Sequence, residues 1–198
     1  MSYPEIYVLR HGETEWNAAR RMQGGLDSPL TPLGRAQARA MGRALAARGI
    51  TAVTHRVLTS PQGRARATAE LALGPDHAPE PRLREIAMGD WSGRDRAEID
   101  RRWPGPPGEH FLDFYARAPG GEGFAALWAR CALLLASLDG PAVLVTHGMT
   151  SRVLRTIATG GGRADLAALP GGQGVVFRVA QGRHELIPAP LAGGAEAG

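Results

Sequence analysis

The chain of 198 residues contains no lysine, a single cysteine and no apolar run long enough to cross a bilayer. A membrane-spanning helix needs about 20 apolar residues, so we expect no membrane partner. The lone Cys131 excludes an internal disulfide framework and a cysteine-rich zinc site, and its apolar neighbours predict a buried core residue. Residues 1–5 lack the basic and apolar segments of a secretory signal. We therefore expect a cytoplasmic location.

Because lysine is absent, all 23 basic side chains are arginines, and the formal net charge is +4. Together with the frequent Ala, Gly and Pro, this composition indicates G+C-rich coding, so the high isoelectric point says little about partners. The arginines are spread along the chain among Asp and Glu, whereas nucleic-acid-binding proteins gather basic residues on one face. We therefore expect no nucleic-acid partner. The same composition bias means that being an arginine is not by itself evidence that a residue has a functional role.

Short apolar segments alternate with helical ones along the chain. Thr31 is a plausible N-cap before Pro32, and Gly49 can end the helix that follows. The run at residues 142–146 is apolar without alternation, as in a strand buried on both faces. Strands are predicted at residues 6–9, 52–59, 142–146, 174–179 and 183–187, an extended segment at 82–86, and helices at 32–48, 63–73, 94–103, 124–138 and 149–158.

This alternation predicts right-handed crossovers and an α/β fold. We expect a mainly parallel central sheet covered by helices on both faces, with a C-terminal antiparallel hairpin around Gln181 and Gly182. The length and the 43% hydrophobic content fit one domain over residues 1–188. Residues 189–198 are expected to form a flexible tail. In such sheets, ligands bind outside the carboxyl ends of the strands.

Two strand ends carry the same pair of residues. His11 and Gly12 follow the first strand and Arg10, while His147 and Gly148 follow the buried strand. A histidine beside an arginine suits attack on phosphorus, because a guanidinium can grip the phosphoryl oxygens with two hydrogen bonds. One such histidine is explained equally well as a buried structural residue. Two at matching strand ends predict a site.

Five ordered segments resemble the histidine phosphatase (phosphoglycerate mutase-like) superfamily. The resemblance extends from residue 6 to about residue 179 and implies a three-layer α/β/α fold and a phosphohistidine mechanism that needs no metal or other cofactor. The segments are residues 9–17 (LRHGETEWN), 23–24 with 27–31 (QG, DSPLT), 64–70 (RARATAE), 83–85 (LRE) and 146–148 (THG).

The resemblance also implies roles for individual residues. His11 would be the nucleophile, and Glu85 would protonate the leaving group and later activate water. The phosphate- and substrate-binding residues would be Arg10, Asn17, Gln23, Gly24, Arg64, His147 and the backbone amide of Gly148. The cations of Arg10 and Arg64 are expected to favour the neutral form of His11.

Some assignments have alternatives within the sequence. Arg64 rather than Arg66 fits the Arg-Ala-x-x-Thr-Ala pattern, and Asp90 lies close to Glu85. Asn17 and Gln23 are also compatible with roles as turn caps. The remaining histidines, which match no motif, are interpreted as structural or solvated: His55, His77, His110 and His184.

The segment after Glu85, residues 86–93, lacks the basic and tyrosine-containing stretch usual in the mutases and resembles the phosphatase branch. We therefore expect hydrolysis of a small phosphorylated molecule. Gly123 stands where relatives often have serine. Residues 104–121 are expected to form a lid over the site. Three aromatic residues of that lid are expected to select the leaving group: Phe111, Phe114 and Tyr115.

Several functions remain open from the sequence. Within the family, a phosphoglycerate mutase, a sugar-phosphate phosphatase and an α-ribazole phosphatase are all compatible with these motifs. Outside it, His11, His147 and a carboxylate could serve a metal-dependent hydrolase, although their spacing fits no compact metal motif. A non-catalytic phospholigand-binding protein is a third alternative. The sequence gives no indication of oligomeric state.

Overall fold

A computed structural model describes residues 3–191 of the chain, and its strands form one six-stranded sheet in the order β3-β2-β4-β1-β5-β6. Strands β3, β2, β4 and β1 run parallel, while β5 is antiparallel to β1 and β6 is antiparallel to β5. The expected mainly parallel sheet with a C-terminal antiparallel hairpin is confirmed. The strands are β1 (Ile6–Arg10), β2 (Arg56–Thr59), β3 (Ala78–Pro79), β4 (Ala142–Thr146), β5 (Val176–Ala180) and β6 (Arg183–Ile187).

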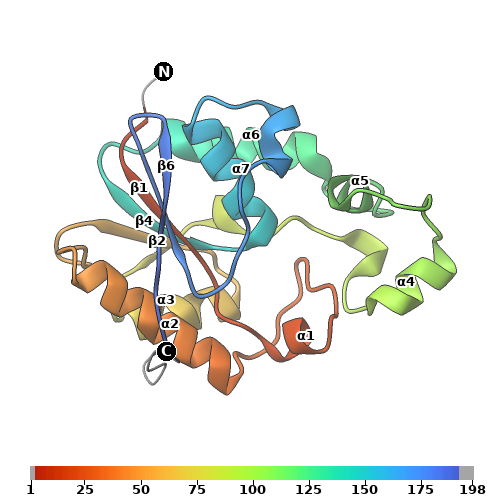
Figure 1. Ribbon diagram of the computed structural model, residues 1–198, viewed down its shortest axis with the longest axis horizontal. Helices are drawn as coiled ribbons and strands as arrows, with labels where there is room; N and C mark the ends of the chain where they lie inside the picture. Colours follow the sequence, from red (N-terminus) through yellow and green to blue (C-terminus); the bar gives the residue numbers. More distant parts are fainter. Residues whose placement is uncertain (1–2, 192–198) are drawn as a thin grey trace, which may run out of the picture.

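Helices cover both faces of the sheet (Figure 1). On one face, α2 (Pro32–Ala46) and α3 (Gly63–Leu73) pack through Met41 and Ala69 against alternate residues of β1 and β4. On the other, α6 (Gly123–Ala136) and α7 (Gly148–Ala158) bury an apolar cluster that includes Cys131 and Leu154. The predicted three-layer sandwich and the buried position of Cys131 are therefore both confirmed.

The short helices α1 (Glu15–Ala18), α4 (Arg96–Arg102) and α5 (Phe111–Ala116) lie beyond the edge of the sheet where β1 ends (Figure 1). None of the helices within residues 3–191 is long and apolar enough to cross a membrane. The 3-10 helices are η1 (Pro81–Leu83), η2 (Gly89–Trp91) and η3 (Arg163–Ala167).

Two predicted strands differ from the structure. The strand expected at residues 52–59 begins only at Arg56, because the Thr54 hydroxyl donates to the carbonyl of Gly49 at 2.9 Å and accepts from the Thr51 amide at 3.0 Å. Such local hydrogen bonds compete with a strand ladder, and Val53 is left 94% exposed. The extended segment expected at residues 82–86 overlaps η1, while the short edge strand β3 was not predicted.

The expected lid contains the helix α5, whose faces separate its aromatic residues. Phe114 is 3% exposed and packs on Trp91, with ring centroids 4.6 Å apart, so it belongs to the core. The expectation that Phe114 selects the leaving group is wrong. Phe111 and Tyr115 lie one turn apart and line a surface cavity instead.

Gly123 opens α6 with a φ of +72°. This left-handed conformation is strained for residues that carry a side chain, which gives a physical reason for glycine at this position. The N-cap of the helix is Glu122, whose carboxylate pairs with Arg130 at 2.6 Å instead of capping the backbone.

The C-terminal part of the described chain continues past the domain end expected at residue 188. Ala189 is 9% exposed and belongs to the apolar cluster beneath α2 and α3. Residues 192–198 of the expected tail lie outside the described residues.

Candidate active site

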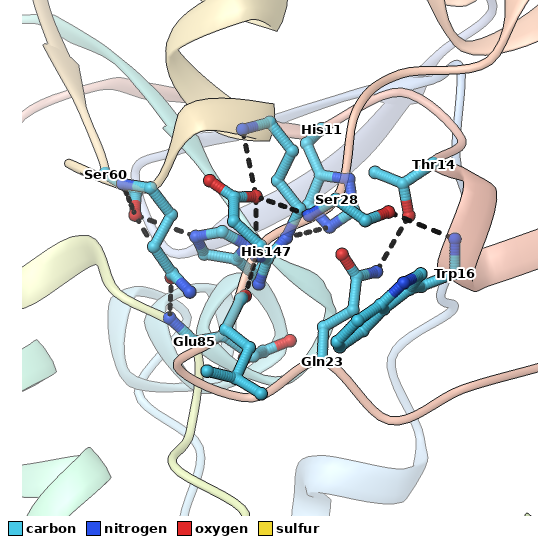
Figure 2. Close-up of polar contacts among 12 residues, drawn as sticks. His11, Thr14, Trp16, Gln23, Ser28, Ser60, Glu85 and His147 are labelled. Atoms are coloured by element: carbon cyan, nitrogen blue, oxygen red, sulfur yellow. Dashed lines mark hydrogen bonds and ion pairs between the residues drawn. The ribbon is translucent and has the colours of Figure 1, made fainter. Parts of the chain in front are cut away.

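The site lies where three neighbouring parallel strands end. Arg10 of β1 pairs with Thr146 of β4, and Thr59 of β2 pairs with Val145. The residues after these strand ends are therefore adjacent, and the rings of His11 and His147 lie 5.1 Å apart between centroids (Figure 2). The sheet order brings the two predicted histidines together.

Hydrogen bonds fix the tautomer of His11, which is 3% exposed. Its Nδ1 lies 2.8 Å from the carbonyl oxygen of Gly12, which can only accept, so Nδ1 carries the proton. The Nε of Arg64 donates to Nε2 at 3.2 Å. Burial, then the charges of Arg10 and Arg64, hold the pKa of His11 well below its usual 6.5. The imidazole is neutral, and its Nε2 lone pair lies beside a guanidinium.

Arg64 is anchored by the loop between α1 and α2. Its guanidinium donates to the carbonyl oxygens of Gly24 (3.1 Å) and Leu26 (2.6 Å) and to the carboxylate of Asp27 (3.1 Å), and it is 2% exposed. These contacts satisfy a buried cation and fix the direction of its Nε. Arg66 is exposed, so the structure favours Arg64 over Arg66 as the site residue.

His147 is oriented by a residue that the sequence reading did not single out. Its Nε2 lies 2.8 Å from the hydroxyl of Ser60, the residue after β2 (Figure 2). Burial, followed by the charges of His11, Arg64 and Arg10, lowers the pKa of His147 well below 6.5. Both site histidines are therefore neutral before a ligand binds.

Buried polar atoms without hydrogen-bond partners gather at this site. Within the described residues there are five such side-chain atoms, and three are Arg10 Nε, His147 Nδ1 and Gln23 Oε1. Leaving a buried polar group unpaired costs about 1–3 kcal/mol. Their concentration here indicates that a polar ligand completes the site.

Glu85 lies at the N-terminus of α7. One carboxylate oxygen accepts from the amide of Met149 (3.2 Å), and the other accepts from the amide and hydroxyl of Thr150 (3.1 Å each) and the amide of Ile86 (3.0 Å). A Cβ added to Gly148 would lie 3.6 Å from both this carboxylate and the Arg10 guanidinium. Glu85 and Arg10 therefore approach each other beside Gly148. The exposed Asp90 has no such contacts.

Asn17 and Gln23 serve both the loop and the cavity. Asn17 forms a capping box with Thr14, and its Oδ1 also accepts from the side chain of Gln173 at 3.1 Å. These contacts use the oxygen and leave Nδ2 available for a ligand. Gln23 donates to the hydroxyl of Thr14 at 2.9 Å. The predictions of a turn cap and of a ligand contact are thus compatible.

These side chains surround a cavity of about 100 Å³. Of the predicted residues, His147 and Gly148 are not among its lining residues: the ring of His147 lies 5.1 Å from that of His11 between centroids, and Gly148 lines the adjoining cavity. The remaining histidines lie elsewhere. The cavity is lined by Arg10, His11, Asn17, Arg21, Met22, Gln23, Gly24, Arg64, Glu85, Met88 and Tyr115.

Three polar residues that support the site were missed from the sequence. Ser60 follows a predicted strand end, so the rule that ligands bind there could have found it. Gln62 donates to the Gly24 carbonyl at 2.8 Å and accepts from the Glu85 amide at 2.9 Å. Gln173 contacts the His11 carbonyl at 3.3 Å from a glycine-rich loop. Neither glutamine stands in a pattern that indicates its contacts.

Comparisons with known proteins found relatives among curated proteins and among solved structures. Among curated proteins, "Probable phosphoglycerate mutase GpmB" of Photorhabdus laumondii is 36% identical over 161 residues, 73% of this chain and 70% of that protein. The GpmB of Serratia proteamaculans is 50% identical over 88 residues, which cover 43% of this chain and only 39% of that protein.

Solved structures and a family model extend the match to nearly the whole chain. The mycobacterial glucosyl-3-phosphoglycerate phosphatase in complex with VO3 is 31% identical with a TM-score of 0.74, covering 94% of this chain and 98% of that one. TTHB049 of Thermus thermophilus is 36% identical with a TM-score of 0.70, covering 90% and 94%. The model of the histidine phosphatase superfamily (branch 1) matches residues 6–185. The chain therefore belongs to the histidine phosphatase superfamily.

Proposed function

We propose that this protein hydrolyses small phosphomonoesters through a phosphohistidine on Nε2 of His11, without a metal ion. The observation that carries this proposal is the tautomer of His11: its lone pair faces the cavity-lining guanidinium of Arg64. Glu85 lies at the same cavity and is positioned to exchange protons with the leaving group and with water.

In the first step, the Nε2 lone pair attacks phosphorus and the bond from phosphorus to the ester oxygen breaks. Glu85, protonated at this stage, gives its proton to that oxygen, so an alcohol leaves. Arg10, Arg64 and the Nδ1–H of His147 donate to the phosphoryl oxygens as charge develops on them. Removing one well-placed donor of this kind costs about 3 kcal/mol in a typical enzyme.

In the second step, water attacks the phosphohistidine. The ionised Glu85 accepts a proton from that water, the bond between nitrogen and phosphorus breaks, and inorganic phosphate leaves. His11 regains its neutral form, which burial and the two neighbouring guanidinium groups favour. Glu85 is then protonated again, and the cycle is closed.

A metal-dependent hydrolase is disfavoured by the surroundings of the histidines. Nδ1 of His11 donates to a carbonyl, and its Nε2 accepts from the Arg64 guanidinium. A divalent cation on Nε2 would lie against that guanidinium and close to Arg10, where like charges repel strongly because the site is buried. The same position suits a phosphate anion.

Phosphoryl transfer to a second hydroxyl remains the rival activity, because several relatives are named as phosphoglycerate mutases. The two activities share the phosphohistidine and differ in its fate. With 3-phosphoglycerate as the substrate, a phosphatase releases inorganic phosphate, whereas a mutase forms 2-phosphoglycerate. Product analysis after one and many turnovers therefore separates them.

The proposed chemistry is tested by mixing the protein with p-nitrophenyl phosphate as the substrate and stopping the reaction rapidly without acid, so that an acid-labile phosphohistidine survives. We expect one acid-labile phosphate per chain on His11, inhibition by vanadate and no loss of activity with a chelator. His11→Asn should lower kcat by about 10³-fold or more. The matched control is His110→Asn, which changes an N-cap outside the cavity. Near-normal turnover by His11→Asn would refute the proposal.

A further inference from the structure

A second cavity of about 300 Å³ adjoins the phosphoryl site. The two cavities share Arg10, Glu85 and Tyr115. Because Glu85 is the proposed proton donor to the ester oxygen, the group bonded to that oxygen must extend from the small cavity into the larger one. The larger cavity is therefore the place for the leaving group.

The charge of this cavity is unusual for a site that accepts a neutral alcohol. Its charged lining groups are the guanidinium groups of Arg10, Arg152 and Arg155 and the carboxylate of Glu85, so three positive charges face one negative charge. Within residues 3–191, none of the three arginines forms an ion pair. By contrast, Arg117 and Arg130 each pair with a glutamate.

Arg155 is the most deeply buried of these cations, at 1% exposure. Its hydrogen-bond partners are neutral: Ser151, the carbonyl of Pro170 at 2.9 Å and Nε2 of His184 at 2.9 Å. Burial and the charge of Arg152 lower the pKa of Arg155 to about 9, so it remains a cation at neutral pH. A buried charge without a counter-ion is costly, and an anionic ligand would remove that cost.

Arg152 is one turn before Arg155 on α7 and is held in place from one side. Its Nη1 donates to the carbonyls of Leu166 (3.0 Å) and Leu169, and its guanidinium lies 5.1 Å from the ring centroid of Phe111. These contacts fix the orientation of the Arg152 guanidinium and leave its Nε and Nη2 free to bind a ligand. A guanidinium held in this way matches the two oxygens of a carboxylate or phosphate.

We propose that the larger cavity binds a leaving group that carries its own anionic group, a carboxylate or a second phosphate, on Arg152, with Arg155 adding positive charge behind it. This inference rests on the proposed function and names its substrate class: phosphate esters of small hydroxy acids or of phosphorylated alcohols. Phe111 and Tyr115 line the same cavity and would pack on the carbon skeleton between the two anions.

The first test compares substrates on the wild-type protein and needs no variant. One pair is 3-phosphoglycerate and its methyl ester, and the other is propane-1,3-diol bisphosphate and the monophosphate. We expect kcat/KM to be at least about tenfold higher for the anionic member of one pair, with the ratio falling as salt screens the charges. A preference within the first pair identifies a carboxylate as the anionic group that the cavity binds, and a preference within the second pair identifies a phosphate. Equal values in both pairs would overturn the inference.

The second test removes the charge of Arg152. Arg152→Gln should reduce that ratio about tenfold, mainly through KM of the anionic substrate, and Arg152→Lys should restore part of it. The control is Arg39→Gln, which removes an exposed charge on α2. An equal loss with anionic and uncharged leaving groups would show that Arg152 is only structural and would contradict the proposal.

The failure of the proposed function would be recognisable separately. In that case p-nitrophenyl phosphate would not be hydrolysed in a His11-dependent manner. Calorimetric titration of 3-phosphoglycerate and of its methyl ester into His11→Asn protein would still measure the preference for the anion without turnover. Equal affinity for the two compounds would then refute the anionic subsite by itself.

Discussion

At the scale of single residues, the site depends on groups that orient a functional side chain rather than touch a substrate. Ser60 holds Nε2 of His147 at 2.8 Å. The Nδ1 of His147 lacks a partner in the described residues, and it carries the ring proton when the Ser60 hydroxyl donates to Nε2. In the proposed mechanism, Ser60 thereby orients His147 as a donor for a phosphoryl oxygen.

Removing the Ser60 hydroxyl should therefore impair catalysis without destroying the site. Ser60→Ala is expected to lower kcat about tenfold, since His147 loses the hydrogen-bond partner that orients its ring. Ser60→Thr, which keeps a hydroxyl, should recover much of that loss. Steady-state kinetics with p-nitrophenyl phosphate measure the effect. If Ser60→Ala and the wild type have equal kcat and KM, Ser60 does not position His147.

The sequence indicated the residues that we propose carry the chemistry better than the residues that support them. His11, Arg10 and His147 stand at strand ends, where a local pattern and a topological rule agree. Gln62 forms a hydrogen bond with Glu85, which is 23 positions away in the sequence. Gln173 forms one with Asn17, which is 156 positions away. No local periodicity encodes such contacts, because they arise only when loops from different crossovers meet.

At the scale of secondary-structure elements, the position of Arg64 depends on how α3 packs on α2. Arg64 is in the first turn of α3, and the two helices approach closely at Gly42. A Cβ at Gly42 would lie 2.8 Å from Cα of Ala72 and still closer to its carbonyl oxygen. This contact is with the backbone, which cannot rotate away, so the absence of a side chain sets the distance between the helices.

Gly42→Ala should destabilise the fold by about 1–3 kcal/mol because the helices must separate. Helix propensity alone predicts the opposite, since alanine is favoured over glycine by about 1 kcal/mol within a helix. Urea unfolding measures the difference. The matched control is Gly140→Ala, where the added Cβ meets no atom within 4 Å. A stabilised Gly42→Ala protein would contradict the proposed close packing.

The lid shows why an element can be anticipated while its faces cannot. Residues 104–121 were expected to cover the site, and α5 within them does present Phe111 and Tyr115 to a cavity. Phe114 lies on the same short helix but packs between Trp91 and the guanidinium of Arg96, 3.9 Å from its ring centroid. Aromatic composition predicted a contact with ligand, but only packing decides which ring is in the core.

At the scale of the whole molecule, the order of the strands in the sheet places residues that are far apart in the sequence close together in space. Strands β2, β4 and β1 are neighbours and parallel, so residues that follow positions 10, 59 and 146 share one edge. The alternation of strands and helices predicted that edge, because parallel strands require crossovers. The precise strand limits were less predictable, since side-chain hydroxyls at residues 51–54 replace ladder hydrogen bonds.

Assembling two buried neutral histidines at that edge has a consequence for stability. The pKa values of His11 and His147 are lowered in the folded protein, whereas both are near 6.5 in an unfolded chain. Below that pH the unfolded chain binds more protons than the native state, so the free energy of unfolding decreases as the pH falls. The carboxyls with lowered pKa values, such as Glu5, act in the same direction but mainly at and below about pH 5, where the unfolded chain begins to protonate them.

We therefore expect the stability of the ligand-free protein to decline from about pH 7 to pH 5, with a slope approaching roughly 1.4 kcal/mol per pH unit for each buried histidine. Urea unfolding in phosphate-free buffers measures it. His147→Gln should show a shallower decline, because one of the protons taken up on unfolding is lost; His184, whose pKa is also lowered by burial and by Arg155, contributes to the slope of both proteins. If the free energy of unfolding of the wild type stays constant across this range, the histidines titrate normally in the folded protein. The claim that burial and the neighbouring arginines keep His11 neutral would then be wrong.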